Sequence, residues 1–293
     1  MTAYTCRRTH NTEFVEIRGI KYAVHCWGST QAKPVFLLHG WADTGRSFQF
    51  LADELSQDYF LIAPDWRGFG DSEWSSQGYW FPDYLGDLDA LVRHFTTARQ
   101  VDIVGHSMGG NVACLYAGAK PGAVRRMVIL DVYGLPATTP GMAPDRYAKW
   151  MEQLETGYEF SRYDNLERLA EHIIKLAPGL STERALFIAE CWGKSTPGSF
   201  EILLKADPAH KRVNPVLYRR EEARACWQNI EARCLFIYGA DSRMYHSYMK
   251  EGYREEFLEC IRYFDDQVIE DASHMLHLQQ PRELAGRLDA FLS

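Results

Sequence analysis

The chain has 293 residues, of which 46% are hydrophobic, and its formal net charge is −7 at pH 7. A length of this order accommodates one large α/β domain, or a core domain with an insertion. The acidic balance argues against a nucleic-acid partner, and no membrane span is expected because no run of about 18 apolar residues is present.

The N-terminus and the cysteines bear on the cellular compartment. Residues 1–8 include charged side chains with no apolar segment behind them, so no signal peptide is expected. The seven cysteines are odd in number, scattered and without a C-x-x-C pair. This usage predicts reduced, mostly buried thiols in a cytoplasmic protein, with neither a disulfide framework nor a zinc site.

Predicted strands and helices alternate in the first part of the chain. Residues 14–27 alternate in polarity around Gly19 and predict an antiparallel hairpin at a sheet edge. Apolar runs at 35–38 and 60–63 predict strands that are covered on both faces, with a helix over 47–55 between them. An amphipathic helix is predicted over 84–95.

A further strand, over 101–104, runs directly into Gly105-His106-Ser107-Met108-Gly109 and then into a helical pattern that ends near residue 119. Gly-x-Ser-x-Gly between a strand and a helix is the pattern of a nucleophile elbow, a strained turn that projects the serine hydroxyl away from both elements. Glycine is needed on both sides because side chains there would collide across the turn. The backbone N–H groups that begin the helix face developing negative charge. The pattern predicts Ser107 as a nucleophile.

The alternation of strands and helices stops after the predicted strand at 127–131. Between 133 and 226 the segments 146–154, 165–176 and 181–191 indicate helices separated by proline and glycine. Strands at 234–239 and 268–270 and a helix over 281–292 resume the pattern. We therefore predict an α/β fold with a mainly parallel, doubly wound sheet, whose active residues follow the carboxyl ends of the strands. The core comprises 1–132 and 227–293, and 133–226 is a helical insertion.

Motifs in this order resemble those of the α/β-hydrolase family over nearly the whole chain. They are His39-Gly40-Trp41, the stretch 64–72 (PDWRGFGDS), Gly105-His106-Ser107-Met108-Gly109-Gly110, and Ser273-His274. The resemblance implies an α/β-hydrolase fold in which the insertion is a helical cap between strands six and seven. It also implies that 64–72 is a structural turn.

The resemblance assigns roles around Ser107. A serine hydroxyl is a weak nucleophile at neutral pH and needs a base, which the resemblance places at His274. It implies that the backbone N–H groups of Trp41 and Met108 form the oxyanion hole. His277 is expected at the surface or packed near the loop of His274.

The acid that would complete a triad has two candidates. The commonest family arrangement is Gly-x-x-Asp after strand seven, but this chain reads Gly239-Ala240-Asp241-Ser242 there, with the aspartate one residue early. Some relatives, such as haloalkane dehalogenases, carry the acid after strand six, where Asp131 stands. Either carboxylate would hold the imidazole tautomer and stabilise the imidazolium. We prefer Asp131 and retain Asp241 as the alternative.

The leading functional interpretation is hydrolysis of a carboxylic ester, or a related acyl bond such as a thioester, through an acyl-enzyme on Ser107. No metal and no cofactor is implied. The aromatic and methionine side chains of the insertion suit a small apolar or aromatic acyl substrate. Dehalogenase and epoxide-hydrolase chemistry is disfavoured, because those relatives have an aspartate nucleophile.

Three other functions use the same fold. They are hydrolysis of a carbon–carbon bond, as in the meta-cleavage hydrolases, cofactor-independent dioxygenation of an N-heteroaromatic compound, and small-molecule reception without catalysis. The sequence leaves the choice among them, and the oligomeric state, open.

Overall fold

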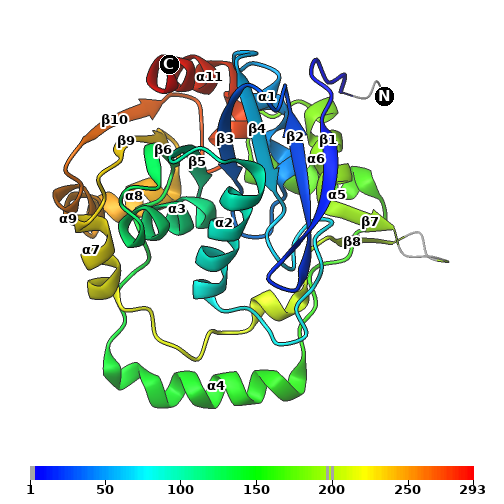
Figure 1. The fold of residues 1–293 in the computed structure, drawn as a ribbon. Coiled ribbons are helices and arrows are strands. Elements are labelled where there is room, and N and C mark those ends of the chain that lie inside the picture. The colour runs from blue at the N-terminus through cyan, green and yellow to red at the C-terminus, as the bar shows by residue number, and fades with distance from the viewer. Residues whose placement is uncertain (1–3, 196–197, 199–200) are drawn as a thin grey trace.

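The computed structural model describes residues 4–195, 198 and 201–293, and an eight-stranded sheet lies at its centre (Figure 1). The strands are β1 (Asn11–Ile17), β2 (Ile20–Trp27), β3 (Lys33–Leu38), β4 (Tyr59–Pro64), β5 (Val101–His106), β6 (Val124–Leu130), β9 (Arg233–Gly239) and β10 (Phe264–Ile269). Their order is β1-β2-β4-β3-β5-β6-β9-β10. The pairs from β4 to β10 are parallel, whereas β1 and β2 form an antiparallel edge. The predicted fold class is confirmed.

Helices cover both faces of this sheet, which explains the unbroken apolar strands. Phe36 and Leu38 of β3 belong to the apolar cluster under α2 (Phe81–Phe95), α3 (Met108–Ala119), α7 (Arg220–Gln228) and α9 (Tyr253–Cys260). Val35 and Leu37 point the other way, into the cluster under α1 (Gln49–Ala52) and α11 (Pro281–Leu292). Successive side chains therefore enter different layers, and each must be apolar.

The two largest differences from the predicted boundaries concern the helix expected over 47–55 and the last strand. The helix expected over 47–55 is a 3-10 turn, η1 (Gly45–Phe48), followed by the short α1, and the carboxylate of Asp53 just beyond it accepts the N–H groups of Arg7 and Arg8. β10 begins at Phe264, four residues before the predicted start. It is an edge strand whose first residues are exposed, so it lacks the apolar run that marks a buried strand.

The insertion between β6 and β9 comprises η2 (Pro140–Met142), α4 (Ala143–Thr156), α5 (Leu166–Leu176), α6 (Thr182–Trp192), β7 (Gly193–Ser195), β8 (Ile202–Leu204), η3 (Pro208–Lys211) and α7. α5 and α6 share a third apolar cluster with Phe50 and Leu278 of the core. α4 lies apart from the sheet, along the lower edge of Figure 1. The small hairpin of β7 and β8 was not predicted, because its three-residue strands are too short to show a periodicity.

α7 ends the insertion, and it packs on the core. A Cβ at Gly118 of α3 would lie 2.0 Å from the carbonyl oxygen of Cys226, so the two helices meet backbone to backbone. The Asn229 side chain also donates to the Gly118 carbonyl. Among the described residues, none of the helices combines the length and apolar character needed to cross a bilayer. All seven cysteines are free thiols and five are buried.

Candidate active site

Ser107 lies on a strained turn between the end of β5 and the start of α3. Its backbone has φ 50° and ψ −114°, a conformation that a residue with a side chain rarely adopts. A Cβ at Gly105 would stand 2.7 Å from the carbonyl oxygen of Gly109, and one at Gly109 would stand 2.2 Å from that of Leu38. Glycine is thus required on both sides of the serine by contact distances, as the sequence pattern predicted.

His274 and Asp131 are paired. His274 follows β10, and its Nδ1 lies 2.6 Å from Oδ2 of Asp131, which follows β6 and is 3% exposed. Ser242 Oγ donates to the same carboxylate oxygen at 2.6 Å. Because Nδ1–H donates to the carboxylate, the neutral imidazole keeps its lone pair on Nε2, as a general base for a serine requires.

The alternative acid, Asp241, lies elsewhere. Its side chain is exposed, and its backbone N–H donates to the Ala272 carbonyl. The residue after it, Ser242, is the one that turns inward to Asp131. Of the two aspartates, the structure brings only Asp131 to the imidazole of His274.

The loop after β3 lies directly against the nucleophile turn. A Cβ at Gly40 would be 3.2 Å from Cβ of Ser107. Trp41 follows in this loop, 49% exposed, with its ring 5.7 Å from that of Phe160 in the insertion. Met108 is the first residue of α3, so its N–H has no acceptor within the helix. Both backbone positions expected for an oxyanion hole therefore border Ser107.

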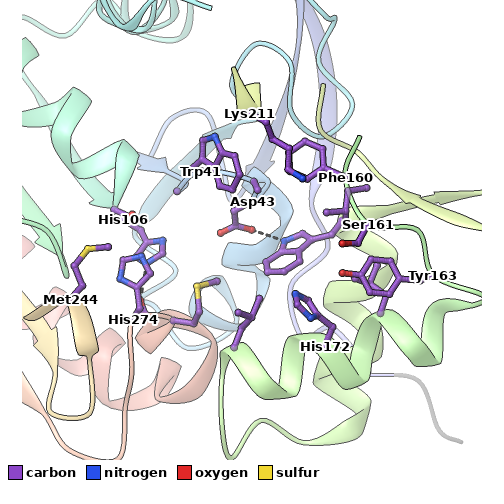
Figure 2. Close-up of a pocket in the computed structure, with 18 residues that line it drawn as sticks. Trp41, Asp43, His106, Phe160, Ser161, Tyr163, His172, Lys211, Met244 and His274 are labelled. Carbon is purple, nitrogen blue, oxygen red and sulfur yellow. Dashed lines mark hydrogen bonds between the residues drawn. The ribbon is translucent and has the colours of Figure 1, made fainter. Parts of the chain in front are cut away.

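A cavity of about 540 Å³ lies between the core and the insertion, a usual size for a small-molecule site. Figure 2 shows His106 and His274 on one side of it and Phe160, Tyr163 and His172 on the other. Its lining residues are Gly40, Trp41, Ala42, Asp43, His106, Ser107, Phe160, Ser161, Tyr163, Leu169, His172, Leu176, Trp192, Leu204, Lys211, Met244, His274 and Met275. The Lys211 ammonium lies 4.8 Å from the centre of the Phe160 ring and donates to the Glu159 carbonyl.

The motif at 64–72 is buried except at Gly70 and Asp71, and its bonds serve the fold. The Asp65 carboxylate accepts two backbone N–H groups, that of Gly45 at 2.6 Å and that of Asp71 at 2.8 Å. The Trp66 indole donates to the His39 carbonyl, and the Trp66 N–H donates to the His39 ring. These bonds tie the loop after β4 to the loop after β3, which positions Trp41 beside Ser107.

Two buried polar residues lie behind the serine, and the sequence analysis did not single out one of them, Asp43. His277, expected at the surface or packed near the loop of His274, is fully buried, and its ring centre lies 4.5 Å from that of His106. Asp43 is 2% exposed and lies 3.6 Å from His277. His277 lies in α10 (Leu276–Gln279), three residues after His274, and this His-x-x-His spacing was the available signal, since residues three apart lie near one another when the chain turns helically.

Known proteins resemble this chain in sequence and in fold. The chain is 27% identical to a serine hydrolase-like protein of Danio rerio, and the match covers 94% of this chain and 85% of that protein. It is 26% identical to the human serine hydrolase-like protein 2, over 92% and 90%. The thioesterase domain from the curacin biosynthetic pathway has a TM-score of 0.85 at 19% identity and covers 97% of this chain and 100% of that domain, a likeness of fold. Residues 33–281 match the family model of the alpha/beta hydrolase fold, and the chain therefore belongs to the α/β-hydrolase family.

Proposed function

We propose that the protein hydrolyses a carboxylic ester or a related acyl bond, such as a thioester, through an acyl-enzyme on Ser107. The observation that carries the proposal is the 2.6 Å contact between His274 Nδ1 and Asp131, next to a serine held on a strained turn. An ordinary turn would serve the fold better than this strained one. The strain therefore favours a catalytic role for the serine beside the oriented imidazole.

The proposed reaction has two displacements. His274 Nε2 takes the Ser107 hydroxyl proton while the oxygen attacks the acyl carbon, and the imidazolium is stabilised by Asp131. The backbone N–H groups of Trp41 and Met108 hold the oxyanion, and each such donor is typically worth about 2.7–4 kcal/mol in the transition state. The imidazolium then protonates the leaving alcohol or thiol. A water deprotonated by His274 attacks the acyl-enzyme and releases the carboxylic acid.

The cavity supports an apolar or aromatic acyl group of modest size. Its walls are formed largely by aromatic, leucine and methionine side chains, and its volume of about 540 Å³ exceeds what an acetyl group would fill. The relatives in zebrafish and human are named serine hydrolase-like proteins, which favours catalysis by a serine over reception without catalysis.

The test is hydrolysis of p-nitrophenyl esters from acetate to palmitate by the wild type and Ser107→Ala, with a fluorophosphonate label on both proteins. We expect turnover that falls at least about 10³-fold in the variant, and one label on Ser107 of the wild type. The optimum chain length would report the depth of the cavity.

Other outcomes would favour other functions. Labelling of Ser107 without hydrolysis of any ester or thioester would contradict the proposal and favour the carbon–carbon bond hydrolase. Equal turnover in the wild type and Ser107→Ala would also overturn it, since the dioxygenase needs no serine nucleophile. Tight binding of small molecules with no turnover would favour the receptor.

A further inference from the structure

Three polar side chains meet behind Ser107 in a place that the proposed reaction does not use. They are Asp43 in the loop after β3, His106 at the end of β5, and His277 in α10. Their exposed fractions are 2%, 1% and 0%. One ligand atom from each, a carboxylate oxygen and two imidazole nitrogens, lies within 4.8 Å of the others.

The hydrogen bonds of this cluster leave its inward atoms free. His106 Nε2–H donates to the His274 carbonyl at 2.8 Å, so the lone pair of His106 is on Nδ1. Asp43 Oδ1 accepts the N–H of Thr44 at 2.8 Å and the Trp192 indole at 2.7 Å, the bond drawn at Asp43 in Figure 2. Within the described part of the chain, Asp43 Oδ2, His106 Nδ1 and both ring nitrogens of His277 have no hydrogen-bond partner.

The burial of the cluster favours a bound cation. The Asp43 carboxyl is 2% exposed, and one of its oxygens lies within 4.8 Å of imidazole nitrogens of His106 and His277. A buried carboxylate beside unpartnered nitrogen atoms is costly unless something positive is bound there.

We propose that Asp43, His106 and His277 form a binding site for one divalent transition-metal ion of the zinc class. Two histidines and one carboxylate are a common ligand set for such ions. Ligands at about 2.0–2.1 Å in a tetrahedral site stand about 3.3 Å apart. The distance from Asp43 Oδ2 to His277 Nε2 is 3.6 Å, so this pair needs only a small side-chain adjustment.

The surroundings of two of the three ligands, His106 and Asp43, have the form expected of a metal site. Ligating histidines usually donate their second N–H to a carbonyl or carboxylate, and ligating carboxylates are themselves hydrogen-bonded. His106 meets the first condition through the His274 carbonyl, and Asp43 meets the second through Thr44 and Trp192. Asp43 and His106 also border the cavity, which offers an entry path and a water for the fourth position.

The site would join three segments that carry the candidate machinery. Asp43 is two residues after Trp41, His106 immediately precedes Ser107, and His277 is three residues after His274. A bound ion would therefore hold these turns together, and its binding does not depend on which bond the protein cleaves.

The experiment is titration of metal-free protein with Zn²⁺ by calorimetry, the visible spectrum of the Co²⁺-loaded protein, and thermal unfolding with and without Zn²⁺. We expect one ion per chain, Co²⁺ absorption bands of a tetrahedral site, and an unfolding midpoint raised by at least about 4 °C at saturation. Asp43→Asn and His277→Gln should each weaken Zn²⁺ binding at least about 100-fold and abolish the Co²⁺ bands.

The control is His274→Ala, which removes the neighbouring imidazole but keeps the backbone carbonyl that orients His106. It should bind Zn²⁺ as the wild type does. Loss of binding in His274→Ala with retention in Asp43→Asn would overturn the proposal, because the ion would then sit on the candidate base. A dissociation constant above about 10 µM for Zn²⁺ and the wild type would also overturn the proposal, since a buried water would then be the better occupant of the cluster. Should Asp43→Asn fail to fold, His277→Gln and the Co²⁺ spectrum decide the matter.

Discussion

The turns at the strand ends and the helix α4 of the insertion are built in opposite ways. In the described residues, the non-glycine positions with positive φ are Arg18, Ala42, Ser107, Asp131 and Asp271, and all but Arg18 lie in loops that follow the carboxyl ends of parallel strands. The turn at Ser107 is fixed by close backbone contacts, and Asp131 is buried. In α4 only Gln153 is buried. The candidate chemistry is therefore held rigidly, while part of the insertion has little packing to hold it in place.

Another part of the insertion, residues 205–210, is joined directly to the segment after β4. Backbone bonds run from Gly70 to the Lys205 carbonyl at 2.7 Å and from Asp207 to the Gly68 carbonyl at 2.8 Å. His210 of η3 stacks between the rings of Phe69 and Tyr79, with ring centres 3.9 and 3.6 Å away. The insertion is thus anchored near η3 as well as through the apolar packing of α5 and α6 on the core, and it is less constrained along α4.

The largest expected effect comes from Asp131→Asn. The amide keeps the shape but cannot hold the His274 tautomer or stabilise its imidazolium, so kcat on the best ester should fall by about 10³–10⁴-fold. Asp241→Asn is the matched control, and its kcat should stay within about threefold of the wild type because the side chain is exposed. Equal losses of kcat in the two variants would contradict the assignment of the triad acid to Asp131 in the turn after β6.

A methyl group at Gly109 should be the next largest perturbation. In Gly109→Ala the new Cβ would stand 2.2 Å from the Leu38 carbonyl oxygen, which is backbone and cannot move aside cheaply. We expect the free energy of unfolding to fall by about 3 kcal/mol or more, measured by urea denaturation. In Gly141→Ala, in the insertion, the new Cβ meets nothing within 4 Å, so the free energy of unfolding should change by less than about 0.5 kcal/mol. A similar cost at both sites would contradict the contrast between the regions.

The anchor at His210 predicts a dependence of stability on pH. Burial lowers the pKa of His210 to about 3, so the folded protein keeps the ring neutral while the unfolded chain binds a proton below about pH 6.5. Stability is therefore lost as the pH falls from about 6.5 towards 3, and at pH 5 the loss from this residue is about 2 kcal/mol.

Urea denaturation at pH 7.5 and pH 5.0 checks this prediction. Between the two pH values, the free energy of unfolding of His210→Gln should fall by about 2 kcal/mol less than that of the wild type. Contributions from the other histidines cancel in this comparison. His94→Gln, in the exposed last turn of α2, should keep the wild-type dependence. Parallel pH dependences for all three proteins would show that His210 is not held neutral by the stack.

The smallest effects are expected on α4. Tyr147 and Met151 are 52% and 55% exposed, so Tyr147→Ser and Met151→Ser should each change the free energy of unfolding by less than about 0.5 kcal/mol. Urea denaturation at two protein concentrations measures this. A loss above about 1 kcal/mol, or one that grows with concentration, would mean that this face of α4 is covered in solution.

The parts of the fold that follow from local patterns could be predicted from the sequence. Doubly covered strands are apolar throughout, and the turn around Ser107 requires glycine at fixed positions. The partner of His274 could only be ranked, because it depends on two strands far apart in the chain. The N–H of Asp131 donates to the Ile237 carbonyl at the end of β9, which brings Ser242 against its carboxylate. The choice between a surface and a packed position for His277 stayed open for the same reason, since its burial comes from neighbours on other segments.

The left-handed backbone of Ser107 and Asp131 has a consequence for evolution and engineering. Each such residue costs of order 1–3 kcal/mol, which the surrounding structure must offset. Glycine at these positions would relieve part of that cost, but it would also delete the serine hydroxyl or the carboxylate. Selection for heat resistance and selection for turnover therefore act in opposite directions on the same two residues, and a thermostable descendant of this protein would have to gain its stability elsewhere in the chain.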